Sequence, residues 1–145
     1  MGYLREISSD KDTHFTTAIS GTNGQEQENI TRLTSNNITV KGVAIHTDQK
    51  LAWDVLFYKT DAFGATDQDA DTLCGYVKFA NTVYYANPAS KTQFVSYSTV
   101  DIPYIDGDAT NELHVALVNR SSTIKTAGGN GEVRVKCYYQ DNSAY

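Results

Sequence analysis

Apolar and polar residues alternate along most of this 145-residue chain, and helical periodicity is nearly absent. In LAWDVLFYK (51–59), ELHVALVNR (112–120) and EVRVKCYYQ (132–140), every second residue is apolar. Successive side chains of a β-strand point to opposite faces, so the pattern predicts strands with one face in a core. Because a slip of one residue would move all these apolar side chains into water, the alternation also fixes the register.

Shorter alternating segments predict further strands, at residues 14–19, 28–34, 37–47, 73–80, 82–86, 93–99 and 101–105. Pro103 has no backbone N–H, which places the last of these segments at a sheet edge or a bend. Turn residues such as Asn23-Gly24 and Asp106-Gly107 separate the segments. About eight to ten short strands are typical of an all-β antiparallel β-sandwich, and we expect a jelly-roll-like arrangement.

The first 35 residues differ from the rest of the chain in composition and in the spacing of their apolar residues. They are rich in Thr, Ser, Asn, Gln and Gly, with isolated apolar residues such as Phe15 and Ile19. We expect either an extended N-terminal arm, ordered against a neighbouring chain, or a first hairpin of the same domain, and the hairpin is favoured. Residues 36–145 are expected to form the β-sandwich domain, since no linker or internal repeat divides them.

Charge, hydropathy and cysteine usage exclude several classes of protein. The net charge is −5 without a basic cluster, so the surface repels phosphate and nucleic acid is not an expected partner. No apolar run approaches the ~20 residues of a membrane-spanning helix, and the first residues lack a signal-peptide core. We therefore expect no membrane partner. Cys74 and Cys137 fit no disulfide or zinc pattern and are predicted to be buried hydrophobes of a protein made in a reducing cytosol.

The segment TDQDADT (66–72) carries three aspartates at alternate positions. A helix–loop–helix calcium site that starts at Asp67 needs a glycine at its sixth position and a glutamate at its twelfth. Thr72 and Lys78 stand there instead. The segment therefore favours a turn in which aspartate side chains accept backbone N–H bonds, while an irregular calcium site that adds Asp61 stays open.

The sequence shows no catalytic constellation. Paired-carboxylate catalysis needs one carboxyl in an apolar pocket, whereas the acidic residues lie in polar loops and Asp54 is predicted on the solvent face of its strand. His14, His46 and His114 lie in three different segments, without the His-x-His spacing that aims two rings at one ion. We expect solvent-facing or edge histidines, no metal or other cofactor, and no enzymatic activity.

Two features suggest a binding surface, and an ordinary solvated surface is the alternative interpretation of both. The doublets Tyr84-Tyr85 and Tyr138-Tyr139 place their rings on opposite sides of a strand, so one ring of each is expected to be exposed. Basic residues outnumber acidic ones after residue 112, an asymmetry that favours solvated faces and, as the alternative, docking of copies or partners. Exposed tyrosines are frequent at protein interfaces and can stack on sugars. The interface candidates are Phe15, Ile19, Tyr84, Tyr138, Arg134 and Lys136.

Residues 40–80 and 112–140 resemble small jelly-roll virion proteins of tailed bacteriophages, which act as capsid cement or decoration proteins. The shared features are the strand–DxDxDT–strand passage, the HVALVNRS strand and the final hairpin that ends in a Tyr-rich strand. The resemblance implies a metal-free virion protein that binds the major capsid protein or another virion protein. It also implies a homotrimer at capsid symmetry axes, and it supplies no catalytic residue. The alternative is a carbohydrate- or receptor-binding module of a phage tail or fibre, which would use exposed tyrosines or Trp53.

Overall fold

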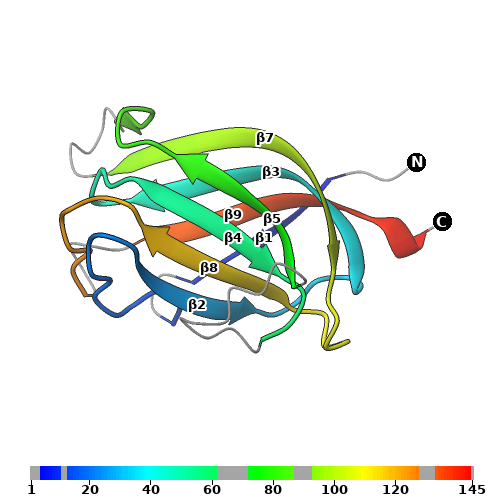
Figure 1. The fold of residues 1–145 in the computed structure, drawn as a ribbon. Helices are drawn as coiled ribbons and strands as arrows, with labels where there is room; N and C mark the ends of the chain where they lie inside the picture. Colours follow the sequence, from blue (N-terminus) through cyan, green and yellow to red (C-terminus); the bar gives the residue numbers. More distant parts are fainter. Residues whose placement is uncertain (1–3, 11–12, 62–71, 87–92, 128–132, 145) are drawn as a thin grey trace.

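The computed structural model describes residues 4–10, 13–61, 72–86, 93–127 and 133–144, and within them the chain forms two packed antiparallel sheets (Figure 1). A single turn of 3-10 helix, η2 (Asn142–Ala144), follows the last strand. None of the described residues forms a helix long and apolar enough to cross a bilayer. The strands are β1 (Arg5–Ser8), β2 (Gly24–Ile30), β3 (Asn37–Thr47), β4 (Trp53–Tyr58), β5 (Leu73–Phe79), β6 (Tyr85–Ala86), β7 (Phe94–Ile105), β8 (Leu113–Asn119) and β9 (Val133–Asp141).

The strand order is that of a jelly roll. One sheet has the order β1-β9-β3-β7-β6 and the other the order β2-β8-β4-β5. The antiparallel pairs β1–β9, β2–β8, β3–β7 and β4–β5 are nested, as in a long hairpin that has been rolled into two layers. Two such layers joined by Greek-key connections define the jelly roll. The predicted all-β, jelly-roll-like sandwich is therefore confirmed.

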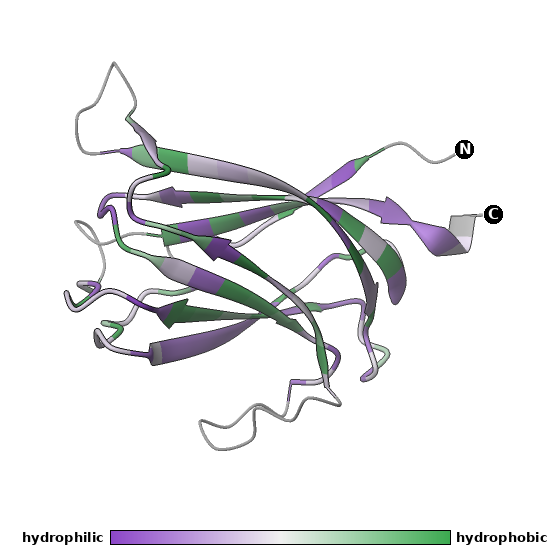
Figure 2. Cartoon of the chain, turned by 45° about the horizontal axis from the view of Figure 1, so that its top comes forward, coloured by the Kyte–Doolittle hydropathy of each residue, from purple (hydrophilic) through white to green (hydrophobic). Residues whose placement is uncertain are grey.

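The core between the sheets contains the apolar residues that the alternation assigned to it. Trp53, Val55 and Phe57 of β4 are fully buried there, as are Val135 and Tyr139 of β9. The suggestion that Trp53 contacts a sugar or a receptor is therefore wrong, because its ring has no exposed surface. Figure 2 shows the corresponding alternation of hydrophobic and hydrophilic residues along the strands. Burial of each such side chain contributes about 1.5–3 kcal/mol, which makes this layer the main source of stability.

A β-bulge in β3 changes the phase of its alternation. The register shifts between Val40 and Gly42 against both β7 and β9, which leaves Lys41 without a paired residue on β9. Val40 and Val43 consequently both face the core and are fully buried. An extra residue beside a glycine is a common bulge composition, and it bends and twists the strand locally.

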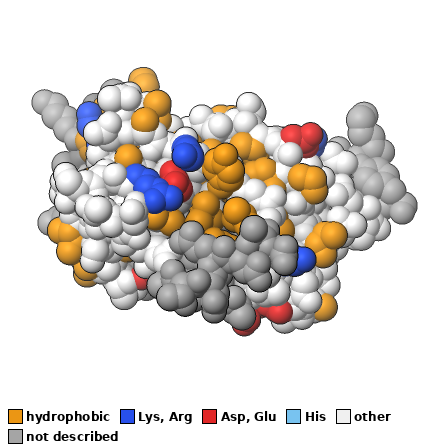
Figure 3. Space-filling model, viewed as in Figure 1, with side chains coloured by type: hydrophobic (Ala, Val, Ile, Leu, Met, Phe, Trp, Pro, Cys, Tyr) orange, Lys and Arg blue, Asp and Glu red, His pale blue; other side chains and the backbone are white. Residues whose placement is uncertain are grey.

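The outer face of the four-stranded sheet is also buried at its centre. Leu56 and Tyr58 of β4 and Ala116 and Val118 of β8 form a second apolar cluster there. Figure 3 shows hydrophobic side chains gathered on this face. The prediction that Asp54 faces solvent is wrong: its side chain is almost fully buried and accepts a 2.7 Å hydrogen bond from Arg120 Nε. β4 and β8 are the two central strands of this sheet.

The N-terminal region is part of the sandwich. β1 pairs with β9 and β2 pairs with β8, so the two strands lie at the edges of different sheets and do not form the expected hairpin. Between them, Phe15 and Ile19 are buried in the core of the same chain. The fully buried Lys125 donates hydrogen bonds from Nζ to the backbone oxygens of Phe15 and Thr17. The described part of residues 1–35 is thus integrated with the rest, and the expectation of an arm ordered by another chain is corrected.

Other strand predictions hold in part. Residues 14–19 contribute only an isolated bridge between Ile19 and Lys125. The segments predicted at 93–99 and 101–105 form one strand, β7, which includes Pro103. Strand β6 pairs only with Phe94 and Val95, at the start of β7. At Pro103, β7 is therefore paired on one side only, with β3. The proline therefore occupies an edge position, as its missing N–H requires.

Candidate functional site

The outer face of the five-stranded sheet brings together three of the predicted interface residues. Arg134, Lys136 and Tyr138 occupy alternate positions of β9, and their inward neighbours are buried. They lie opposite His46, Ala44 and Gly42 of β3, respectively. Arg134 is exposed, and Lys136 and Tyr138 are partly exposed. A row of two cations and one aromatic ring therefore runs along the outer face of β9, beside the central strand β3.

Two tyrosines that were not among the interface candidates extend this row. Tyr97 of β7 pairs with Ala44 and is 54% exposed, and Tyr85 of β6 is 67% exposed. The rings of Tyr97 and Tyr138 meet edge to face, with centroids 6.0 Å apart. We call the set Tyr85, Tyr97, Arg134, Lys136 and Tyr138 the tyrosine–arginine face.

Gly42 provides the space for the Tyr97–Tyr138 contact. A Cβ atom at this position would lie 2.3 Å from Tyr97 Oη, so the ring of Tyr97 extends over the glycine. The absence of a side chain at the bulge therefore sets the position of Tyr97. This contact depends on pairing between β3 and two other strands, so no local pattern in the sequence indicates it.

The charges of this face are only partly compensated. Lys136 Nζ lies 3.5 Å from Glu6 Oε1, and Lys41 Nζ lies 2.9 Å from Asp101 Oδ1. Among the described residues, no ion pair is formed by Arg134. Burial lowers the pKa of His46, and the neighbouring charges of Arg134 and Lys136 lower it further. The face is therefore locally positive on a protein whose net charge is −5.

The other three interface candidates do not join this face. Phe15 and Ile19 are 1% and 2% exposed, so their side chains pack in their own domain and cannot contact a partner. Tyr84 is partly buried against the core, and burial raises its pKa. Its neighbour Tyr85 is the exposed member of the doublet. In the second doublet, Tyr139 is buried and Tyr138 reaches the surface, as the alternation predicts.

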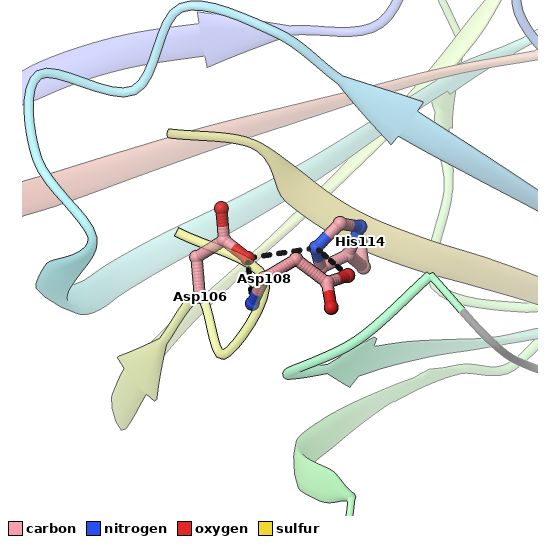
Figure 4. A group of neighbouring side chains, drawn as sticks. All are labelled: Asp106, Asp108 and His114. Carbon is pink, nitrogen blue, oxygen red and sulfur yellow. Dashed lines mark hydrogen bonds and ion pairs between the residues drawn. The ribbon is translucent and has the colours of Figure 1, made fainter. Parts of the chain in front are cut away.

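A separate group of titratable residues lies at one end of the sandwich, where the β7–β8 loop meets β8 (Figure 4). His114 Nε2 lies 3.0 Å from Asp106 Oδ1 and 3.4 Å from Asp108 Oδ2. On the other side of the ring, His114 Nδ1 lies 2.7 Å from Asn29 Oδ1. The predicted solvent-facing or edge position is wrong for His114, whose side chain is fully buried.

Asp106 organises the loop that carries this group. Its Oδ2 accepts hydrogen bonds from the N–H and hydroxyl of Thr110 and from the N–H of Glu112. Its Oδ1 accepts the N–H of Asp108 at 3.0 Å. Burial acts to raise the pKa of Asp106, but these hydrogen bonds and that of His114 outweigh it and lower the pKa to about 2.

A buried tyrosine fixes the loop to β8. Tyr104 Oη donates a 2.8 Å hydrogen bond to the carbonyl of Glu112 and accepts one of 2.9 Å from the N–H of His114. Asn36 adds two contacts, since its carbonyl accepts the N–H of Asp106 and its Oδ1 accepts that of Asn111. The loop is therefore held on both sides, and the carboxyl groups of the cluster have a defined position.

The remaining residues considered as candidates lie apart. His14 Nδ1 accepts the N–H of Asp10, and His46 belongs to the tyrosine–arginine face. The aspartate-capped turn is predicted at residues 66–72, and its aspartates lie outside the described residues. Asp61 is described, and its N–H donates a 2.8 Å hydrogen bond to Asp108 Oδ2.

Comparisons with family models, with curated proteins and with solved structures found no match for this chain.

Proposed function

We propose that this chain is a non-enzymatic structural protein of a virion, of the capsid cement or decoration type. It docks on the major capsid protein or another virion protein through the tyrosine–arginine face, and this face is the observation that supports a docking role. The virion assignment rests on the resemblance of residues 40–80 and 112–140 and on the jelly-roll fold, which recurs in capsid proteins and lectins.

The composition of the face suits protein recognition. Tyrosine and arginine are enriched among the residues that dominate binding energy, because each combines a large contact area with hydrogen-bonding groups. The rings of Tyr97 and Tyr138 are braced by each other and by the sheet, so little side-chain freedom is lost on binding. A standard interface buries about 1,200–2,000 Å², and many such contacts on one shell add through avidity.

The end-of-sandwich cluster favours a structural role over a catalytic one. His114 is fully buried, and Asp106 accepts hydrogen bonds from four groups of its own loop. A general base must reach the proton that it abstracts, and the His114 ring has no exposed atom with which to do so.

A carbohydrate- or receptor-binding role is the second candidate. Tyr85 and Tyr97 favour it, because their exposed rings offer flat surfaces on which a sugar can stack. A glycan array probed with the full-length protein distinguishes the two proposals. Binding to defined glycans without binding to shells would support the second.

The test of the first proposal is co-sedimentation of the purified protein with capsid shells that lack it. The variant Tyr97→Ala/Arg134→Glu is expected to weaken binding at least about tenfold. The matched control is Tyr76→Ala/Lys78→Glu on β5, an equally exposed tyrosine and a lysine on the outer face of the other sheet. Equal losses in both variants, or no binding by the wild type, would contradict the proposal.

Particle stability and native mass complete this test. Shells with the bound protein are expected to withstand higher temperature than bare shells, and shells that melt identically would argue against a cement role. Sedimentation equilibrium of the free protein tests the trimer that the resemblance implies.

A further inference from the structure

The ring of His114 is held between two sets of oxygen atoms. Nδ1 lies 2.7 Å from the side-chain oxygen of Asn29, and Nε2 faces Asp106 Oδ1 at 3.0 Å and Asp108 Oδ2 at 3.4 Å. An amide oxygen only accepts hydrogen bonds, so Nδ1 carries its hydrogen and donates it to Asn29. Nε2 is left to face the two carboxylates, and the second nitrogen of such a ring is a common metal ligand.

One histidine nitrogen and two carboxylate oxygens therefore meet at one point at the end of the sandwich. The His114 ring is fully buried, so its nitrogen keeps these partners and does not exchange them for water. A divalent ion between the three donors would offset the negative charges of the two carboxylates.

The spacing and the support of the three donors fit a metal ion. Their ligand atoms all lie within 4.8 Å of one another. Donors about 2.0–2.2 Å from a tetrahedral ion are separated by about 3.3–3.5 Å, close to the observed distances from Nε2. Asp106 is fixed through its other oxygen by Thr110 and Glu112, and the Asp108 side chain is 31% exposed, which provides an entry path.

We propose that Asp106, Asp108 and His114 bind one divalent metal ion of the zinc class, with Asn29 as the outer partner that orients the histidine. An imidazole and two carboxylates are ordinary zinc ligands, and ligating histidines usually donate their second N–H to an oxygen atom, as His114 does to Asn29. A solvent molecule beside Asp108 completes the coordination. The ion joins β2, the β7–β8 loop and β8 at one end of the sandwich, and it stabilises the fold.

This site shares no residue with the tyrosine–arginine face, so the two proposals can fail separately. The test uses the full-length protein, stripped with a chelator and titrated with zinc chloride by calorimetry and with cobalt chloride by visible absorption. We expect one ion per chain, a higher melting temperature with zinc, and the visible bands of tetrahedral cobalt. Asp108→Asn and His114→Gln should abolish stoichiometric binding, and Asn29→Ala should weaken it about 10–100-fold.

Two control variants outside the cluster and an NMR measurement on His114 show whether metal binding is specific to this site. His46→Gln and Asp101→Asn remove a histidine and an aspartate outside the cluster and should leave the stoichiometry unchanged. Should His114→Gln fail to fold, Asp108→Asn still tests the site, because an amide oxygen can accept the N–H of Asp61 in its place. A folded wild type that binds neither metal overturns the proposal, as does binding that survives both ligand substitutions. Nitrogen-15 NMR of His114 would then show either a doubly protonated ring or a hydrogen on Nε2 with the Asn29 amide reversed.

Discussion

The outer faces of the two sheets differ in burial, although the strands β8 and β9 both alternate inward and outward residues. On β9, the outward residues Arg134, Lys136 and Tyr138 reach the surface. On β8, the outward residues His114, Ala116 and Val118 are 0–2% exposed. Both strands pair on both sides, so hydrogen bonding alone does not explain the difference.

Side-chain size and chemistry differ between the two outward rows. The row on β8 includes the small or apolar residues Ala116 and Val118, whereas the row on β9 carries two long cations and a tyrosine. A small outward residue is buried on either sheet, since Ala44 of β3 is 4% exposed and Ala116 of β8 is fully buried. The long outward side chains of β9 reach the surface and leave that face available for contacts.

The largest expected difference between the two faces is the loss of unfolding free energy when one aspartate is added to each. Ala116→Asp places a carboxylate at a fully buried position without a partner, and we expect a loss of at least about 3 kcal/mol in the free energy of unfolding. Thr99→Asp, exposed on the outer face of the five-stranded sheet, should change it by no more than about 1 kcal/mol. Urea unfolding followed by tryptophan fluorescence measures both. Similar losses would show that the two faces do not differ in burial.

The sequence predicts this contrast only in part. Alternation is a local property, and it correctly assigns the inward residues of β4, β8 and β9 to the core. Whether an outward residue is buried depends on strands that are distant along the chain, so the burial of Asp54, His114 and Ala116 was missed. The bulge at Lys41 and Gly42 leaves no local signal beyond the glycine itself.

The end-of-sandwich cluster shows the same limit. His114 meets Asp106, which is near it in sequence, and Asn29, which is 85 positions away. The proximity of His114 to Asp106 and Asp108 could have been predicted from the sequence. An Asp-Gly-Asp turn at 106–108 precedes a strand that begins with Leu113-His114, so the carboxyl groups lie near the ring. The contact between Asn29 and His114 depends on the pairing of β2 with β8, and the alternation within each strand does not specify which strands pair.

A smaller effect is expected from acid. Asp141, at the end of β9, accepts hydrogen bonds from the hydroxyls of Thr34, Ser35 and Ser143, and these bonds lower its pKa below the ordinary value. The unfolded chain therefore binds a proton at higher pH than the folded one. The stability that Asp141 adds is present above about pH 4 and is lost as the pH falls through its folded-state pKa.

Asp141→Asn should remove this part of the acid dependence. We expect it to lower stability by about 1–2 kcal/mol at neutral pH and to flatten the decline below about pH 4. Asp101→Asn on the exposed face, whose partner is Lys41, should change stability by less than about 1 kcal/mol. Melting temperatures between pH 2 and 7 measure both variants, and an unchanged acid limb in Asp141→Asn would refute the assignment.

The smallest expected effect probes the charge of the tyrosine–arginine face through His46. Burial, followed by the charges of Arg134 and Lys136, lowers the pKa of this histidine. Lys136→Gln and Arg134→Gln should each raise that pKa slightly, because a screened surface charge has only a modest effect at this range. Lys78→Gln on the four-stranded sheet serves as the control and should leave the pKa unchanged.

The direction of the accompanying stability change follows from linkage. With the folded-state pKa below that of the unfolded chain, the unfolded state binds more protons near and below pH 6.5, so stability falls as the pH drops through this window. The two glutamine variants should make this fall shallower, and an NMR titration of the His46 ring reports the pKa directly. A His46 pKa that stays constant in both variants would show that solvent and salt screen the charges of Arg134 and Lys136. The tyrosine–arginine face would then bind a partner through its tyrosines, without a contribution from charge.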